Sequence, residues 1–193
     1  GQQDTILGVQ GADDVLDAVI TCWSSLWTER AITYRGFLNQ GATPGADAPS
    51  APDPTTAGLG LAVIIQELIQ GPDQASGVLF TADPLTGHRG HTVIDAVFGL
   101  GEALVSGQIT PDHFELDTAS GAVLVRTIQG ERPTLSDAQL AQVLALGRRV
   151  ADEYGSPQDI EWTRVGDDLQ LVQTRPITSL FPLPASDGAE LPL

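Results

Sequence analysis

Apolar residues recur every three or four positions in the first part of the chain, and this spacing predicts a helix from Asp13 to about Leu38. Two adjoining apolar stripes run along this helix, one made of Val15, Val19, Cys22 and Leu26 and the other of Leu16, Ile20, Trp23 and Trp27. Such a wide apolar face indicates a deeply buried helix with both tryptophans as core anchors. Residues 41–58 contain four prolines, three glycines and no large apolar side chain, which is typical of an inserted loop or a linker.

After residue 60 the pattern changes to the apolar runs and alternations that are typical of strands. The run Leu61–Ile69 predicts a buried strand. Ser136 and Gln139 match a capping box that opens a helix to about Tyr154, and Gly155 matches its C-terminal stop. Further strands are expected at residues 76–82, 92–97, 113–117, 123–128, 160–164 and 169–174, and a short helix is expected between residues 99 and 107. The pattern therefore predicts a chain that contains both helices and strands.

Charge and composition narrow the possible functions. The 193 residues carry a formal net charge of −16, and all nine basic residues are arginines. A chain this acidic is not a general nucleic-acid binder. Without lysine, the chain cannot form a Walker A phosphate loop, a Schiff base or a lysine-assisted kinase site by itself. The chain has no methionine, so we do not expect Gly1 to be a natural start.

Cysteine and histidine give little support for a metal or redox site. The single cysteine, Cys22, excludes an internal disulfide and a cysteine-based zinc site, and it fits a small core residue. His88 and His91 lie three apart in a loop without a third ligand, and His113 opens a strand. We interpret these histidines as surface or structural residues. No apolar run approaches the roughly 20 residues that span a bilayer and no secretory signal is visible, so we expect a cytoplasmic protein with no membrane contact.

A glycine-containing motif at residues 99–102 (GLGE) gives a weak nucleotide signal. It falls short of the G-x-G-x-x-G pattern because Leu104 stands where the third glycine belongs. The motif fits a simple turn between a strand and a helix. It also fits a backbone that approaches a phosphate or ribose, with Glu102 accepting a hydrogen bond from a hydroxyl.

The last predicted hairpin brings together three side chains of complementary chemistry. Gln173 and Arg175 are two residues apart and therefore share one face of their strand. Glu161 joins that face if it pairs with Gln173, which requires an odd number of intervening residues, such as a three-residue loop at 166–168. A two-residue loop would pair Glu161 with Val172 and turn the carboxylate to the other face.

These three side chains suit a magnesium nucleotide. Glu161 offers carboxylate oxygens to Mg²⁺, Gln173 offers a neutral carbonyl oxygen, and Arg175 matches the terminal phosphate oxygens. The alternative is an exposed polar hairpin face that holds one ion pair.

Several long motifs occur in an order that resembles a known enzyme superfamily. They are residues 1–5 (GQQDT), 22–31 (CWSSLWTERA) with 34–35, 74–84 (QASGVLFTADP), 98–107 (FGLGEALVSG), 155–162 (GSPQDIEW) and 173–178 (QTRPIT). In this order they resemble the nucleotide-binding domain of the phosphoenolpyruvate synthase and pyruvate phosphate dikinase superfamily. The sequences of these motifs are most similar to those of rifampicin phosphotransferases. The resemblance covers nearly the whole chain except residues 41–58 and the tail.

The resemblance implies an ATP-grasp fold, in which two α+β lobes clamp ATP and Mg²⁺. For this chain it implies an α+β fold with a mixed or antiparallel sheet and flanking helices. Residues 1–180 would be the C-terminal portion of that domain, with residues 41–58 as an inserted loop, and residues 181–193 would be an extended tail or linker. The resemblance further implies ATP-site residues at Gly1 and Thr5 in a phosphate-proximal loop, Gln66 beside the adenine, Glu161 and Gln173 on the metal, and Arg175 on the phosphates.

The same resemblance implies a reaction that this chain cannot complete. The family's nucleotide domain begins earlier, and that earlier lobe supplies a lysine and an arginine for the phosphates. The β-phosphate of ATP would pass to a histidine on a separate swivelling domain, and then to an acceptor such as a rifamycin antibiotic or pyruvate on a third domain. Arg175 would stabilise charge on the transferring phosphates. We therefore expect a phosphotransferase component that is inactive alone. The alternatives are a non-catalytic module that binds a nucleotide or a partner, and an inactive truncated product.

Overall fold

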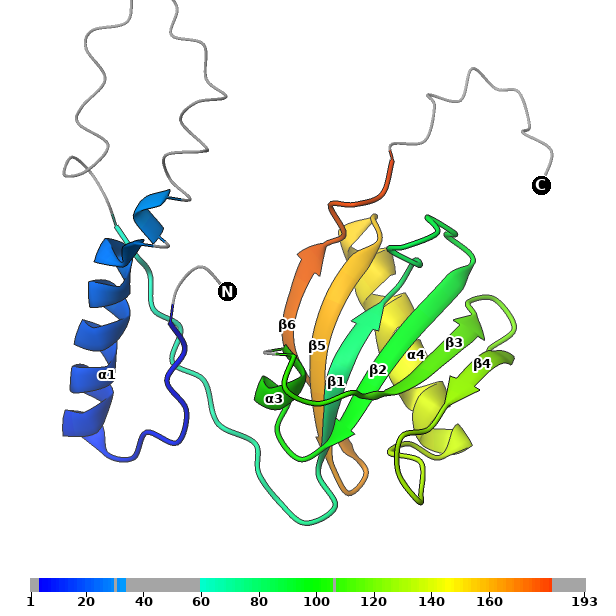
Figure 1. Ribbon diagram of the computed structural model, residues 1–193, viewed down its shortest axis with the longest axis horizontal. Helices are drawn as coiled ribbons and strands as arrows, with labels where there is room; N and C mark the ends of the chain where they lie inside the picture. The colour runs from blue at the N-terminus through cyan, green and yellow to red at the C-terminus, as the bar shows by residue number, and fades with distance from the viewer. Residues whose placement is uncertain (1–3, 30, 34–59, 106, 182–193) are drawn as a thin grey trace, which may run out of the picture. The chain divides into compact units, whose positions relative to one another are not determined.

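The computed structural model describes residues 4–29, 31–33, 60–105 and 107–181 (Figure 1). The chain divides into two compact units, residues 1–68 and residues 69–193. Gly1 and the proline-rich segment 41–58 lie outside the described residues. None of the described helices has the length and apolar character needed to cross a membrane.

In the first unit the predicted helix is interrupted after Ser24, and helical structure resumes at Glu29 and at residues 31–33. Helix α1 spans Ala12–Ser24, and a 3₁₀ turn, η1, follows at Ser25–Trp27. The Ser25 hydroxyl donates to the backbone carbonyl of Cys22 at 2.6 Å, and such bonds compete with regular helix hydrogen bonding. Thr28 then adopts an extended conformation with ψ of 148°. The prediction of one continuous helix towards Leu38 is therefore wrong within the described residues.

Only one of the two predicted apolar stripes of this helical segment includes a buried residue. Cys22 is buried, whereas the four residues of the other stripe are between 50% and 62% exposed: Leu16, Ile20, Trp23 and Trp27. Within the described part of residues 1–68, no element covers this second stripe. The predicted wide buried face and the core role of the two tryptophans are wrong for this part of the chain.

The apolar run at residues 61–69 does not form a strand. Residues 60–70 have no regular secondary structure, and Ile64 and Ile65 are 86% and 69% exposed. The indole N–H of Trp23 donates to the carbonyl of Leu61 at 3.0 Å. A strand needs a neighbour that pairs its backbone groups, and the described residues supply none here. The prediction of a buried strand is wrong.

The second unit is a six-stranded antiparallel sheet with the strand order β4-β3-β2-β1-β5-β6 (Figure 1). Its strands are β1 (Ala75–Phe80), β2 (His91–Phe98), β3 (Asp112–Asp117), β4 (Val123–Thr127), β5 (Gln158–Val165) and β6 (Asp168–Pro176). A short helix, α3 (Glu102–Val105), follows β2, and a long helix, α4 (Asp137–Tyr154), follows β4. The six predicted strands after residue 75 and both predicted helices are present. The α+β prediction is confirmed.

Helix α4 covers one face of the sheet (Figure 1). Its side chains Leu140, Val143 and Leu144 join one apolar core with alternate residues of the strands, among them Leu79 and Trp162. The capping box is present: Ser136 Oγ accepts from the Gln139 N–H, and Gln139 Oε1 accepts from the Ser136 N–H. Gly155 ends the helix with φ of 63°, as predicted.

Strand alternation directs a second set of side chains to the face opposite α4, which we call the open face. The cross-strand register aligns these side chains in rows. One row runs His113, Asp95, Val78, Glu161, Gln173 from β3 to β6, and the next runs Glu115, Val93, Phe80, Asp159, Arg175. Apolar residues of the two inner strands therefore separate two groups of polar side chains. The open face carries three of the predicted site residues of the second unit, Glu161, Gln173 and Arg175.

Candidate functional site

The β5–β6 hairpin places the three predicted hairpin residues on one face. Glu161 pairs directly with Gln173 across the two strands. Directly paired residues of antiparallel strands project to the same side of the sheet. Arg175 follows Gln173 by two positions and shares that side. The predicted pairing of Glu161 with Gln173 is confirmed.

The structure reaches this pairing by a route that differs from the expected three-residue loop. Val165 pairs with Asp168, so the turn between the strands contains only two residues, 166 and 167. The register then shifts between Glu161 and Trp162, because Trp162 pairs with Leu171 and Glu161 pairs with Gln173. Val172 is the extra residue of this β-bulge. A bulge adds one residue to one strand, which restores the odd spacing that the site requires.

Arg175 is held by a carboxylate that the motif spacing did not single out. Its Nε donates to Asp159 Oδ2 at 2.8 Å, and Asp159 is its direct partner across the strands. The side chain of Asp159 is only 13% exposed, whereas that of Arg175 is 60% exposed. One side of the guanidinium is therefore fixed to the sheet while much of the group is accessible to an anion. The signal in the sequence was the alternation in Asp159-Ile160-Glu161, which puts both acids on one face.

The donor set fits a hard divalent cation that arrives with phosphate. Neither Glu161 nor Gln173 uses its side chain in a hydrogen bond or ion pair within the described part of the chain. The second oxygen of Asp159, Oδ1, is buried and has no hydrogen-bond partner there. Mg²⁺ commonly takes one or two carboxylates and completes its shell with phosphate oxygens and water. Among the described residues, no group of three or more His, Cys, Asp or Glu side chains is placed to hold a metal ion.

The remaining predicted site residues lie elsewhere. Thr5 and Gln66 are exposed residues of the first unit, and Gly1 is outside the described residues. Glu102 begins α3 in the second unit and is exposed. The turn before it lies beside Ser76, whose hydroxyl donates to the carbonyl of Gly99 at 2.7 Å. Glu102 thus follows a turn next to the sheet, and the predicted roles of Gly1, Thr5, Gln66 and Glu102 stay predictions.

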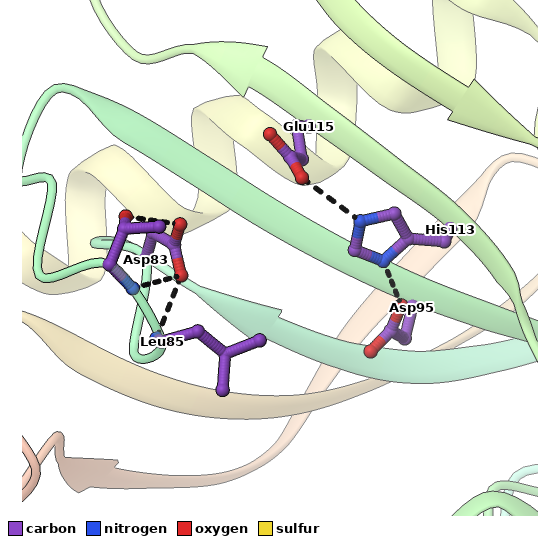
Figure 2. Close-up of polar contacts among 6 residues, drawn as sticks. Asp83, Leu85, Asp95, His113 and Glu115 are labelled. Carbon is purple, nitrogen blue, oxygen red and sulfur yellow. Dashed lines mark hydrogen bonds and ion pairs between the residues drawn. The ribbon is translucent and has the colours of Figure 1, made fainter.

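The opposite side of the open face carries a hydrogen-bonded cluster that we call the His113 cluster, made of Asp95, His113 and Glu115 (Figure 2). His113 Nδ1 lies 2.7 Å from Asp95 Oδ1, and Nε2 lies 3.3 Å from Glu115 Oε1. Partial burial disfavours the charged imidazole, but the hydrogen bonds to the two carboxylates outweigh it and raise the pKa of His113. The imidazole is thus stabilised in its protonated form, which donates to both carboxylates.

We expect the NMR titration of His113 to give a pKa above its ordinary value of 6.5, and Asp95→Asn to lower it. Because folding raises this pKa, the charged form stabilises the fold fully below the unfolded pKa, and that contribution is lost as the pH rises through the folded pKa. Urea unfolding of wild type and His113→Gln should therefore differ most at low pH. A His113 pKa at or below that of an unfolded peptide would contradict the cluster.

A shallow pocket of about 530 Å³ lies next to the His113 cluster. It is lined by Asp83, Thr86, Gly87, His88, His91 and Glu115. Asp83 is already satisfied, because Oδ1 accepts from the N–H groups of Leu85 and Thr86 and Oδ2 accepts from the Thr86 hydroxyl (Figure 2). Burial raises the pKa of Asp83, but these hydrogen bonds outweigh it and lower the pKa overall. This carboxylate therefore orders its own loop.

Comparison with known proteins identifies a matching family and several similar proteins. The family described as pyruvate phosphate dikinase, AMP/ATP-binding domain, matches residues 1–132 and 123–182. A rifampicin phosphotransferase from a Streptomyces species is 43% identical over 210 residues, which cover 97% of this chain and 22% of that protein. The phosphoenolpyruvate synthase of Pyrococcus furiosus is 37% identical over 221 residues, which cover 98% of this chain and 25% of that protein.

The chain thus spans about a quarter or less of the length of these relatives. The family match extends over most of the chain, including the hairpin with Glu161 and Gln173. The α+β architecture of the second unit is consistent with the ATP-grasp type of nucleotide-binding fold. The chain belongs to the pyruvate phosphate dikinase AMP/ATP-binding domain family.

Proposed function

We propose that this chain is the part of a dikinase-type phosphotransferase that binds Mg²⁺ and ATP through the open face of its sheet. The observation that carries the proposal is the pairing of Glu161 with Gln173, beside the Arg175–Asp159 ion pair. Glu161 and Gln173 would hold the ion, which would supply charge neutralisation on the phosphates. Arg175 would bind the phosphate oxygens, because its guanidinium is partly exposed on the same face.

The residues of the chain explain how a triphosphate would be oriented. Asp159 fixes the Nε side of Arg175, which limits the directions in which the guanidinium can meet an anion. The apolar residues Val78 and Phe80 lie between this ion pair and the His113 cluster, so they offer no competing charge. Arg175 would also stabilise negative charge during phosphoryl transfer, which is the catalytic role we propose for it.

The wider reaction belongs to the same proposal. Relatives named rifampicin phosphotransferase and phosphoenolpyruvate synthase support an acceptor such as a rifamycin or pyruvate. We propose that transfer proceeds through a carrier histidine on another domain, and that this chain alone binds the nucleotide weakly and turns over no acceptor, because it contains no lysine for the phosphates. The chain would act in the cytoplasm. The alternative is a nucleotide-binding module without catalysis.

The test is calorimetric titration of Mg·ATP into the chain and into Arg175→Ala. We expect the variant to weaken binding about tenfold or more, because a charge-assisted contact to phosphate is lost. Arg149→Ala is the matched control, since Arg149 is an exposed residue of α4 on the other side of the sheet, and it should bind as wild type does. Equal heats for wild type and Arg175→Ala would remove this guanidinium from the site. ATP turnover with a rifamycin by this chain would contradict its expected inactivity alone.

A further inference from the structure

A second carboxylate faces the proposed magnesium site from the neighbouring side. Val78 pairs with Glu161 on one side and with Asp95 on the other, so the three residues share one row and one face. Adjacent strands lie about 5 Å apart, which places the backbones of Asp95 and Glu161 about 10 Å apart. The side chain between them is an apolar valine that neither neutralises nor bridges the two acids.

Asp95 is held firmly, yet one of its oxygens is available. Its Oδ1 lies 2.7 Å from His113 Nδ1, and its side chain is 25% exposed. The second oxygen has no hydrogen-bond partner within the described residues. Figure 2 shows the three side chains of the His113 cluster linked in order, with His113 between the two acids. Glu115 holds the far nitrogen of His113, so the ring that orients Asp95 is itself fixed.

Among the residues that the structure describes, no cationic side chain lies near Val78 to balance the carboxylates of Asp95 and Glu161. His113 lies on the far side of Asp95, and Arg175 is in the next row, where it contacts Asp159. A divalent cation over Val78 would satisfy both acids. Mg²⁺ usually keeps several of its waters, so an ion that Glu161 binds directly at about 2 Å can meet a second carboxylate through one of those waters.

We propose that Asp95 is a further residue of the Mg·ATP site, which contacts the water shell of the ion from the side opposite Glu161, and that His113 is the residue that positions it. This inference rests on the proposed function, because the nucleotide brings the ion. It assigns the β2–β3 half of the open face to the same ligand as the β5–β6 half. The carboxylate of Glu115 acts only through His113.

Mn²⁺ provides a direct probe, because it replaces Mg²⁺ in complexes with ATP and broadens the NMR signals of nearby protons. The chain has three histidines, so the His113 ring signals can be assigned from the spectrum of His113→Gln. Adding Mn·ATP to the wild-type chain should broaden the His113 signals at lower concentration than those of His88 and His91. Broadening of His88 and His91 first, with His113 unaffected, would overturn the inference.

Variants then separate this inference from the proposed function. Asp95→Asn should weaken Mn²⁺ binding to the chain in the presence of ATP by about tenfold, the lower end of the range for losing a residue that supports a metal. His113→Gln should weaken it less, because the carboxylate remains but is no longer oriented. The matched control is Asp152→Asn on α4, which is exposed and should change nothing.

Each outcome decides one question. If Glu161→Gln abolishes binding of Mn·ATP but Asp95→Asn and His113→Gln bind as wild type does, the inference is wrong and the proposed function stands. If the wild-type chain binds no Mn·ATP at all, the proposed function fails and the inference fails with it. If Asp95→Asn does not fold, as judged by circular dichroism, the His113→Gln affinity and the wild-type broadening decide.

Discussion

Replacing Glu161 by Gln should remove the Mg²⁺ dependence of ATP binding by this chain. The substitution keeps the size of the side chain but removes the negative charge that a hard divalent cation requires. We expect the affinity for Mg·ATP to fall by at least about tenfold, the lower limit seen when supporting residues of metal sites are lost. Isothermal titration at low and high Mg²⁺ concentration measures this directly.

Glu153→Gln is the matched control for Glu161→Gln. Glu153 is an exposed residue of α4, on the opposite side of the sheet from Glu161, so the same chemical change should leave ATP binding unaltered. If both variants retain the Mg²⁺ dependence of the wild type, Glu161 does not bind the ion. If both lose it, the effect comes from net charge rather than from a ligand.

The largest expected loss of stability follows from Trp162→Ala. Trp162 is 1% exposed and belongs to the core between α4 and the sheet. It packs against the backbone of Gly77, where an added Cβ would lie 2.6 Å from Trp162 Cζ2. Removing the indole leaves a large cavity, so the free energy of unfolding should fall by about 3–5 kcal/mol. Urea unfolding followed by circular dichroism measures the change.

Two further variants test the cause of that loss. Trp162→Phe should cost less than Trp162→Ala, because it keeps an aromatic ring and removes an indole N–H that has no hydrogen-bond partner within the described residues. Trp27→Ala makes the same large-to-small change at a residue that is 54% exposed, and the free energy of unfolding should change by less than about 0.5 kcal/mol. Equal losses at Trp27 and Trp162 would contradict the assigned core.

The sequence predicted the second unit far better than the first. The strands and helices after residue 75 have alternation, capping residues and turn glycines that all favour one local structure, such as Ser136 and Gly155 at the ends of α4. The apolar run at 61–69 has only its hydrophobicity. Whether such a run becomes a strand depends on a partner strand, which local sequence does not reveal. The same reason explains the exposed stripe with Trp23 and Trp27.

The types of side chain in the candidate site could be predicted from the sequence, but only some of the residues that form the site could be named. Glu161, Gln173 and Arg175 have a spacing that allows one shared face. Asp159 lies two positions before Glu161, but its contact with Arg175 depends on the β5–β6 register, which the bulge shifts by one residue. The His113 cluster could not be predicted, because Asp95 and His113 become neighbours only through the β2–β3 register.

The extra residue Val172 separates the hairpin tip from the part of β6 that contains Gln173 and Arg175. Between the turn and Val172, paired residues of β5 and β6 have an even number of residues between them along the chain. Beyond Val172, paired residues such as Glu161 and Gln173 have an odd number between them. A three-residue turn without the bulge would also place Glu161, Gln173 and Arg175 on the open face. Either arrangement adds the one residue that makes the number of residues between Glu161 and Gln173 odd. Single-residue insertions in the turn can therefore be compensated by a deletion at position 172. The extra residue can thus lie in the turn or in the strand of homologous hairpins of equal length, while Glu161, Gln173 and Arg175 keep their orientation.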